Sequence, residues 1–279
     1  MFNKAASLIV YAGLMAAQAN AFWNKSHMLV AREAQSLLET DHPDVFAAAL
    51  NELVALQQSR PDLVQERDHP FTECAPFADH VKGMGFIFQS DWHFINLPYL
   101  DEPGTTLDDF NFTQPDKDIV GALTDFTKFL KGEITAADSF YCTEVANVLP
   151  EDADQRSFIL RMIVHYVGDI HQPEHTTALV DSKYPEGDRG GNSESIPSVE
   201  GADNLHFVWD SAIYEYPGKG KPPLSDDLWT WFTSEAERLE QDHPISENQI
   251  KAGQFSDWAQ EGLEIAKTYV YPGKYLLIF

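Results

Sequence analysis

The sequence predicts a mainly α-helical protein with a single domain. Apolar residues recur at helical spacing through most of the chain, alternating strand patterns are scarce, and no internal repeat or linker divides it. The chain has 279 residues, of which 43% are hydrophobic, and this is enough for one large core. We therefore expect one helical domain, with a loop or short β-hairpin around residues 184–203.

Eight segments have the spacing of apolar residues that is typical of amphipathic helices. These segments are residues 28–38, 45–56, 119–130, 136–149, 157–170, 205–214, 226–239 and 245–269. The second follows Pro43, whose fixed φ suits a first helical turn. The fifth is apolar on nearly all sides, so we expect it to be a buried central helix. Residues 184–203 and 218–223 are rich in glycine and proline, and we expect loops there, the second a surface connection.

The formal net charge of the chain is -25, from 44 acidic and 19 basic residues. Such a charge repels the phosphate backbone of nucleic acids, which excludes binding through an extended basic surface. A bound divalent metal can still reverse the charge at one site. If the substrate is a nucleic acid, we therefore expect local contacts with a few nucleotides and weak long-range steering.

Residues 1–21 predict a signal peptide, and residues 22–279 the mature domain. Lys4 supplies a positive charge, an apolar run of small residues follows, and Ala19-Asn20-Ala21 forms a cleavage site. Cleavage would leave Phe22 at the N-terminus of a secreted, luminal or periplasmic protein. A buried N-terminal helix is the alternative. No other stretch is long and apolar enough to cross a bilayer, so we expect no stable membrane association.

Two cysteines, Cys74 and Cys142, could form a disulfide in an oxidising compartment, but the sequence leaves this pairing open. Asn111 begins a glycosylation sequon, which matters if the source is a eukaryote. Asn24 begins another, although a glycan there would obstruct the candidate site residues nearby.

Two histidine–aspartate pairs are the strongest indication of function. His165 and Asp169 are four residues apart, as are His206 and Asp210, so each pair shares one face of its predicted helix. His175 follows in the turn after the first of these helices, which ends before a proline. Imidazole and carboxylate groups are ligands of zinc and similar divalent metals. Five of them together predict a cluster of metal ions.

Three further residues lie in segments that suit a metal site. His27 is five residues after the predicted new N-terminus, Asp79 begins Asp-His-Val-Lys, and His93 lies in Trp-His-Phe-Ile-Asn. The remaining histidines have no such neighbours, and we interpret them as ordinary surface or hydrogen-bonded residues. They are His42, His69, His80, His171 and His243.

The order of these motifs resembles the zinc-dependent S1/P1 nuclease family, which is related to bacterial zinc phospholipase C. From Phe22 to about residue 273, the chain has an aromatic residue with His27 five positions on, then Ala-Asp-x-x-Lys, His-Phe-Ile, His-x3-Asp-x5-His, Gly-Gly-Asn and Asn-Leu-His-x3-Asp. Each motif is weak alone, but the set in this order is specific. The resemblance implies a helical domain of the phospholipase C/P1 nuclease type, with three zinc ions at the bottom of a cleft.

By the same resemblance, a set of nine positions would hold the zinc ions. One ion would take Asp79, His93 and His165, with Asp169 bridging; a second would take His175, His206 and Asp210; the third would take His27, Asp169 and the amine and carbonyl of Phe22. The family usually has tryptophan at the N-terminal position, whereas here tryptophan is the next residue, Trp23. Because an α-amine can bind metal only once it is free, the third ion would require removal of the signal peptide.

The resemblance also implies a reaction, in which zinc ions activate a water molecule that attacks phosphorus in line and leaves a 5′-phosphate. Asp79 would orient this nucleophile. Lys82, at the family's Arg/Lys position, would offset the charge that develops on the phosphate, although lysine cannot make arginine's bidentate contact. The alternative for Lys82 is an ordinary solvated lysine.

Phe94 matches the family position that stacks on a nucleobase, and stacking favours unpaired bases because a duplex hides their faces. Asn192 in Gly-Gly-Asn, together with Gly191 and Asn96, would lie at the base edge. Fungal members have aspartate in place of Asn96, so the base preference could differ. Phe94 could instead be a core aromatic residue, and Gly190 and Gly191 could simply form the turn.

The leading prediction is a secreted, monomeric zinc endonuclease that cleaves single-stranded DNA or RNA and also acts on 3′-nucleotides. A phospholipase C-like phosphodiesterase would share the metals but would need an apolar cleft for lipid. A catalytically silent zinc-binding protein would bind zinc without turnover. Two features depart from the family: Ser26 replaces its usual glycine, and the C-terminal segment is shorter, which would affect stability more than catalysis.

Overall fold

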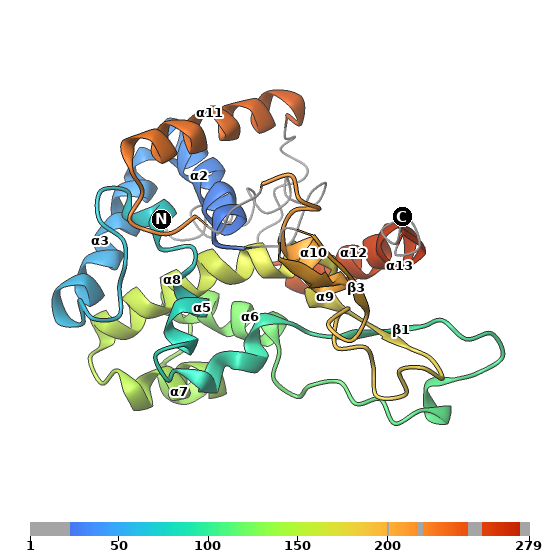
Figure 1. Ribbon diagram of the computed structural model, residues 1–279. Helices are drawn as coiled ribbons and strands as arrows, with labels where there is room; N and C mark the ends of the chain where they lie inside the picture. The colour runs from blue at the N-terminus through green and yellow to red at the C-terminus, as the bar shows by residue number, and fades with distance from the viewer. Residues whose placement is uncertain (1–22, 200, 217–219, 245–252, 274–279) are drawn as a thin grey trace.

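The computed structural model describes residues 23–199, 201–216, 220–244 and 253–273, and it has the mainly helical fold that the sequence predicts (Figure 1). Its α-helices are α2 (Asn24–Asp41), α3 (Pro43–Ser59), α4 (Pro70–Glu73), α5 (Phe77–Lys82), α6 (Ile119–Leu130), α7 (Phe140–Val148), α8 (Asp152–His171), α9 (Pro173–Thr176), α10 (Leu205–Asp210), α11 (Asp226–Asp242), α12 (Phe255–Ile265) and α13 (Tyr271–Gly273). Short 3₁₀ segments are η2 (Ile87–His93), η3 (Leu107–Asp109) and η4 (Ala136–Asp138), and a π-helical turn, η6 (Ala266–Val270), follows α12. The predicted signal peptide and Phe22 lie outside the described residues.

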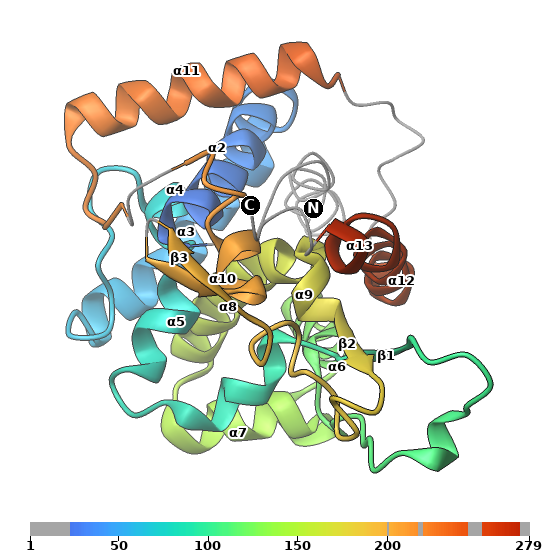
Figure 2. The same cartoon turned by 45° about the vertical axis from the view of Figure 1, so that its right-hand side comes forward.

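Helix α8 is the buried central helix that the sequence predicts. It contacts α3, α5, α6, α7 and α12, and Figures 1 and 2 show it passing through the middle of the fold. Arg161 on this helix is fully buried, and its guanidinium donates hydrogen bonds to Glu66 and to the carbonyl oxygens of Ser157 and Leu53. Because the buried charge is paired, it does not prevent the helix from crossing the core. The result is a rigid support for the two candidate ligands on α8.

Three predicted helices differ from those observed. The predicted helix over residues 245–269 begins only at Phe255 as α12 and continues from Ala266 as the π-helical turn η6, while residues 245–252 lie outside the described residues. The predicted helix over residues 136–149 is divided into η4 and α7, because Ser139 accepts a hydrogen bond from the backbone N–H of Cys142 (3.3 Å) and so begins a new helix. The predicted helix over residues 205–214 ends at Asp210, because residues 212–214 have positive φ angles of 62°, 50° and 66°. This left-handed turn closes the end of α10.

Two small sheets accompany the helices. Strands β3 (Ser195–Val199) and β4 (Ala202–Asn204) form an antiparallel hairpin, which confirms the expectation for residues 184–203. Strands β1 (Leu97–Leu100) and β2 (Thr177–Val180) pair in parallel, and the sequence does not predict them. Each has only four residues and no alternating pattern, so the pairing depends on tertiary packing. It holds the segment after η2 beside α9.

Cys74 and Cys142 are both free and buried, so the disulfide that the sequence left open is not formed. Asn111 of the glycosylation sequon is exposed. Within the described ranges, no helix combines the length and apolar character needed to span a bilayer.

Glu33 on α2 is buried in a region that contacts α11, and its pKa is raised to about 8 by burial and by the nearby Glu240 and Glu235. In the folded protein this carboxyl keeps its proton over a pH range in which the unfolded chain has lost it. The free energy of unfolding therefore falls as the pH rises from 4.5 to about 8.

We predict that Glu33→Gln is more stable than the wild type by on the order of 2–4 kcal/mol near pH 9, with little gain near pH 5. Urea unfolding at the two pH values measures the difference. Glu237→Gln, at an exposed position on α11, is the control and should have the same effect at both. Equal effects of Glu33→Gln at the two pH values would contradict the prediction.

Candidate metal centre

Most of the residues selected from the sequence converge on one cleft of about 450 Å³. Among the residues that line it are Asp79, Lys82, His93, Phe94, Asp169, His175, Asn192, His206 and Asp210. They come from α5, the end of η2, α8, α9, the loop before β3, and α10. His27 and His165 are buried and do not line the cleft, but both border Asp169. The local motifs are therefore parts of one site.

Asp169 is the centre of this site. Its Oδ1 lies 3.3 Å from His27 Nε2 and 3.6 Å from His175 Nδ1, and its Oδ2 lies 2.8 Å from His93 Nδ1 and 3.2 Å from His165 Nε2. Burial alone would raise the pKa of this carboxyl, but His165 and His175 hold it well below its usual range. One ionised carboxylate thus contacts histidines from four separate elements.

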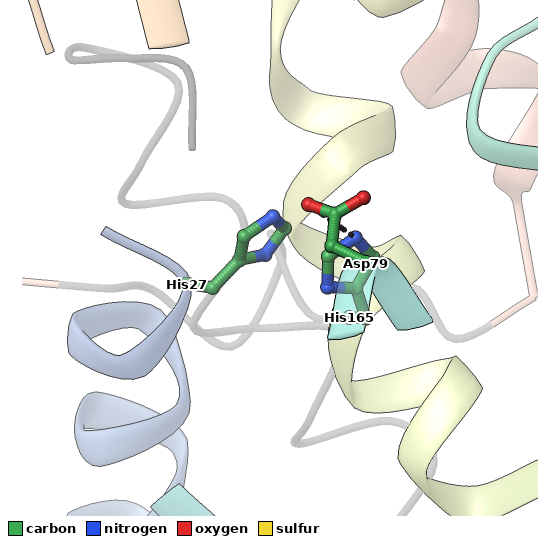
Figure 3. A group of neighbouring side chains, drawn as sticks. All are labelled: His27, Asp79 and His165. Carbon is green, nitrogen blue, oxygen red and sulfur yellow. Dashed lines mark ion pairs between the residues drawn. The ribbon is translucent and has the colours of Figure 1, made fainter. Parts of the chain in front are cut away.

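The possible metal ligands form three groups, of which the first two share His165. They are His27 with Asp79 and His165, His93 with His165 and Asp169, and His175 with His206 and Asp210. Figure 3 shows the first group, in which side chains from α2, α5 and α8 approach one another. The rings of His27 and His165 stack with centroids 3.8 Å apart, and Asp79 Oδ2 lies 3.8 Å from His165 Nε2. His27 therefore lies close to Asp79 and His165 as well as to its predicted co-ligand, Asp169.

Main-chain carbonyl oxygens fix the orientation of three rings. His165 Nδ1 lies 2.7 Å from Ala75 O, His175 Nδ1 lies 2.8 Å from His93 O, and His206 Nδ1 lies 2.6 Å from Gly190 O. A carbonyl can only accept, so each Nδ1 carries a proton, and each ring presents its Nε2 lone pair once it is neutral. Nε2 of His165 is buried 3.2 Å from Asp169 Oδ2, and Nε2 of His206 lies 3.4 Å from Asp210 Oδ2. A neutral ring nitrogen that faces a carboxylate oxygen needs a proton or a metal cation between the two atoms, so this donor set fits a bound metal.

Gln89 and Tyr166, which were not predicted from the sequence, fix the ring of His93. Gln89 Oε1 lies 2.7 Å from His93 Nε2 and accepts from Tyr166 OH at 2.8 Å, while Gln89 Nε2 donates to Ala78 O at 2.9 Å. His93 must therefore donate from Nε2 and present its Nδ1 lone pair to Asp169. Burial lowers the pKa of His93 to about 4, so the ring is neutral and able to bind metal at pH 7. The four-residue spacing of Gln89 and His93 was the available sequence signal.

His175 carries the charge that the carboxylates require in the absence of metal. Burial lowers its pKa, but Asp169 and Asp210 outweigh burial and raise it to about 9. A metal cation at this position would replace the proton, because a ligating histidine must be neutral. Gln172 also donates to Asp210 Oδ1 at 3.1 Å and so orients this carboxylate.

Asp188 organises the loop that supports His206. It is fully buried and accepts from the backbone N–H groups of Leu179 (2.9 Å) and Gly191 (3.0 Å) and from the hydroxyl of Tyr271 (3.0 Å). Gly191 has φ 71°, and a Cβ there would overlap the carboxylate of Glu174. Gly191 therefore serves to shape the loop. The carbonyl of the neighbouring Gly190 accepts a hydrogen bond from His206. Gly191 itself does not line the cleft.

We predict that Tyr271→Phe weakens zinc binding about tenfold, because outer partners that orient metal ligands contribute this much to affinity. The change removes the hydroxyl donor to Asp188 and loosens the loop behind His206. Competition with a fluorescent chelator measures the affinity. Tyr99→Phe is the matched control, since the Tyr99 ring packs 5.5 Å from that of Tyr271 but makes no hydrogen bond to Asp188. Equal zinc affinities in the wild type and Tyr271→Phe would contradict this role.

The remaining predicted residues divide into two sets. Lys82 Nζ lies 2.8 Å from Asp79 Oδ1, and Phe94 and Asn192 line the cleft. Asn96 does not line it and has a left-handed φ of 53°. Five lining residues were not selected as site residues: Trp23, Asn24, Ser90, Phe207 and Lys221. None of the five histidines interpreted as ordinary belongs to a metal group in the described structure.

Comparisons with known proteins agree with this site. The profile of the S1/P1 Nuclease family matches residues 22–275. Relatives in Arabidopsis thaliana include Endonuclease 2, 26% identical over 205 residues (69% of this chain, 56% of the relative), and Endonuclease 1, 27% identical over 217 residues (74% and 60%). Endonuclease 4 is 31% identical over 121 residues (40% and 36%). The chain spans about half the length of Endonuclease 2 and Endonuclease 1. Because the family profile covers nearly the whole chain, this protein belongs to the S1/P1 nuclease family.

Proposed function

We propose that this protein is a zinc-dependent nuclease that cleaves single-stranded DNA or RNA, leaves 5′-phosphates and also hydrolyses 3′-nucleotides. The observation that carries the proposal is the Asp169 carboxylate, which histidines from four elements contact beside a cleft. Family membership and relatives named endonucleases support the same reaction class. The aromatic residues of the cleft, Trp23, Phe94 and Phe207, favour nucleobases over the aliphatic chains of a phospholipid.

Three zinc ions, when bound, would supply Lewis acidity and an activated water molecule. The residues that would hold them are Asp79, His93, His165, Asp169, His175, His206, Asp210, His27 and Phe22. Phe22 lies outside the described residues, but the N–H of Trp23 donates to Asp210 O at 2.8 Å, so the chain enters α2 beside a ligand. We further propose that residues 1–21 are a signal peptide, that the mature domain begins at Phe22, and that it is a secreted or periplasmic monomer.

Asp79 and Lys82 would act on the reacting phosphate. Partial desolvation raises the pKa of Asp79, but His165, His93 and Lys82 outweigh it, so the carboxylate stays ionised and can orient the nucleophile. Lys82 is held 2.8 Å from Asp79 and would donate to a phosphate oxygen as negative charge develops there. Phe94 would stack on the base, and Asn192 would contact its edge.

The test is hydrolysis of single-stranded DNA and RNA by protein that begins at Phe22. Activity should disappear with a chelator, return with zinc and yield 5′-phosphate ends. Duplex DNA should be cleaved more slowly, and phosphatidylcholine should release no choline phosphate. Choline phosphate release would favour the phospholipase C-like function, and zinc-loaded, folded protein without turnover would favour a silent zinc-binding protein.

A further inference from the structure

The cleft contains an aromatic residue and a lysine to which the proposed reaction gives no role. Phe207, a residue that is 38% exposed, and Lys221 line the same cleft as Phe94 and Lys82. Phe207 lies on α10 and Lys221 precedes α11, whereas Lys82 lies on α5 and Phe94 follows η2. The cleft therefore has two sets of one aromatic residue and one lysine, from different parts of the chain.

The backbone of Phe207 is fixed, and its ring is available to solvent. The side chain of Asn204 accepts a hydrogen bond from the Phe207 N–H at 2.8 Å and fixes the start of α10. Helix α10 buries Leu205 and Val208, which leaves Phe207 on its exposed side. Its ring centroid lies 6.3 Å from that of His206, a member of the third metal group. An exposed aromatic ring on a fixed backbone beside a reaction centre suits stacking with a planar ligand.

Lys221 is a cation whose charge no described residue neutralises through an ion pair, unlike Lys82, which is paired with Asp79. Its backbone position is determined on both sides. A Cβ added at Gly220 would lie 3.3 Å from the side chain of Met28, so the chain there packs against α2. The N–H of Leu224 donates to Glu73 Oε1 at 2.6 Å. In a chain of net charge -25, an uncompensated lysine in the cleft is suited to a phosphate group.

We propose that Phe207 and Lys221 form a second nucleotide subsite, in which a base stacks on Phe207 and a backbone phosphate contacts Lys221. This inference rests on the proposed nuclease function and adds to it a preference for chains of at least two consecutive unpaired nucleotides over mononucleotides. A paired base cannot present its face to Phe207, so the subsite adds selectivity against duplexes. The second subsite also agrees with the expectation that the protein contacts only a few nucleotides, because one additional lysine extends the contact by a single nucleotide.

The test compares a thymidine hexanucleotide with thymidine 3′-phosphate in zinc-loaded protein. Phe207→Ala is expected to lower the ratio of kcat/KM for the hexanucleotide to that for the mononucleotide about tenfold, whereas Phe207→Trp, which keeps a stacking surface, should retain the ratio. Lys221→Gln should lower the slope of log affinity for the hexanucleotide against log salt by about 0.7, the value for one phosphate contact in a single strand. Phe140→Ala and Lys128→Gln, at exposed positions outside the cleft, are the controls.

An unchanged substrate ratio in Phe207→Ala, with an unchanged salt slope in Lys221→Gln, would overturn the subsite. Binding of a fluorescent hexanucleotide, followed by anisotropy, separates this result from failure of the nuclease function. If the wild type binds without hydrolysis and Phe207→Ala loses binding, the subsite is correct and the nuclease proposal is wrong. If the wild type neither binds nor cleaves the hexanucleotide, both are wrong.

Discussion

Asp169→Asn is expected to lower kcat/KM for single-stranded DNA by at least about a thousandfold and to remove zinc from more than one position. Each oxygen of this carboxylate faces two ring nitrogens, Oδ1 those of His27 and His175, and Oδ2 those of His93 and His165. Asparagine has nearly the same shape but replaces one oxygen with an amide nitrogen that cannot bind metal. The variant therefore loses one of the two oxygen ligands through which residue 169 would bridge two zinc ions.

Zinc content by mass spectrometry and single-turnover cleavage test this expectation together. Asp116→Asn, at an exposed position outside the cleft, is the matched control and should retain both properties. Full zinc content with wild-type cleavage in Asp169→Asn would show that the bridging carboxylate is not part of the reactive centre.

Lys82→Ala is expected to lower kcat by about a hundredfold with a smaller change in KM, which is the effect of removing one donor to developing charge. Lys82→Arg should keep most of the activity, because it preserves the charge and can contact two phosphate oxygens. Lys82 is held 2.8 Å from Asp79, so the alanine variant also leaves that carboxylate without its cation.

Steady-state kinetics on a single-stranded oligonucleotide measure this effect, with Lys128→Ala as a control at an exposed position outside the cleft. A rise in KM without a fall in kcat would assign Lys82 to substrate binding alone. Zinc content should stay at the wild-type level in both Lys82 variants, since lysine is not a ligand.

The sequence could predict the parts of the site that depend on local geometry. His165 and Asp169 share a helix face whatever surrounds them, and the apolar pattern of α8 already indicates a central helix. The partners that orient the ligands depend on contacts between distant segments. Ile95 donates its N–H to His175 O at 2.9 Å beside the β1–β2 pair, and Tyr271 reaches Asp188 from α13. No local pattern encodes such contacts.

Lys221 illustrates the same limit. In the sequence it belongs to a glycine- and proline-rich segment, predicted to be a surface connection. Residues 218 and 219 lie outside the described residues, and Lys221 itself is exposed. Its place in the cleft arises from packing of Gly220 against α2 and from the hydrogen bond between Leu224 and Glu73. Similarly, the motif Gly190-Gly191 is visible in the sequence, but its role in supporting His206 becomes clear only from the hydrogen bonds of Asp188 and Gly190.

Anomalous X-ray diffraction at the zinc absorption edge, from crystals of zinc-loaded protein that begins at Phe22, tests the metal centre most directly. We predict three zinc peaks per chain, each about 2.0–2.2 Å from histidine nitrogens and aspartate oxygens of the proposed set. Asp169 should ligate two of them, and His175, His206 and Asp210 should surround the third. Absence of zinc from these groups in protein that still cleaves single-stranded DNA would contradict the account.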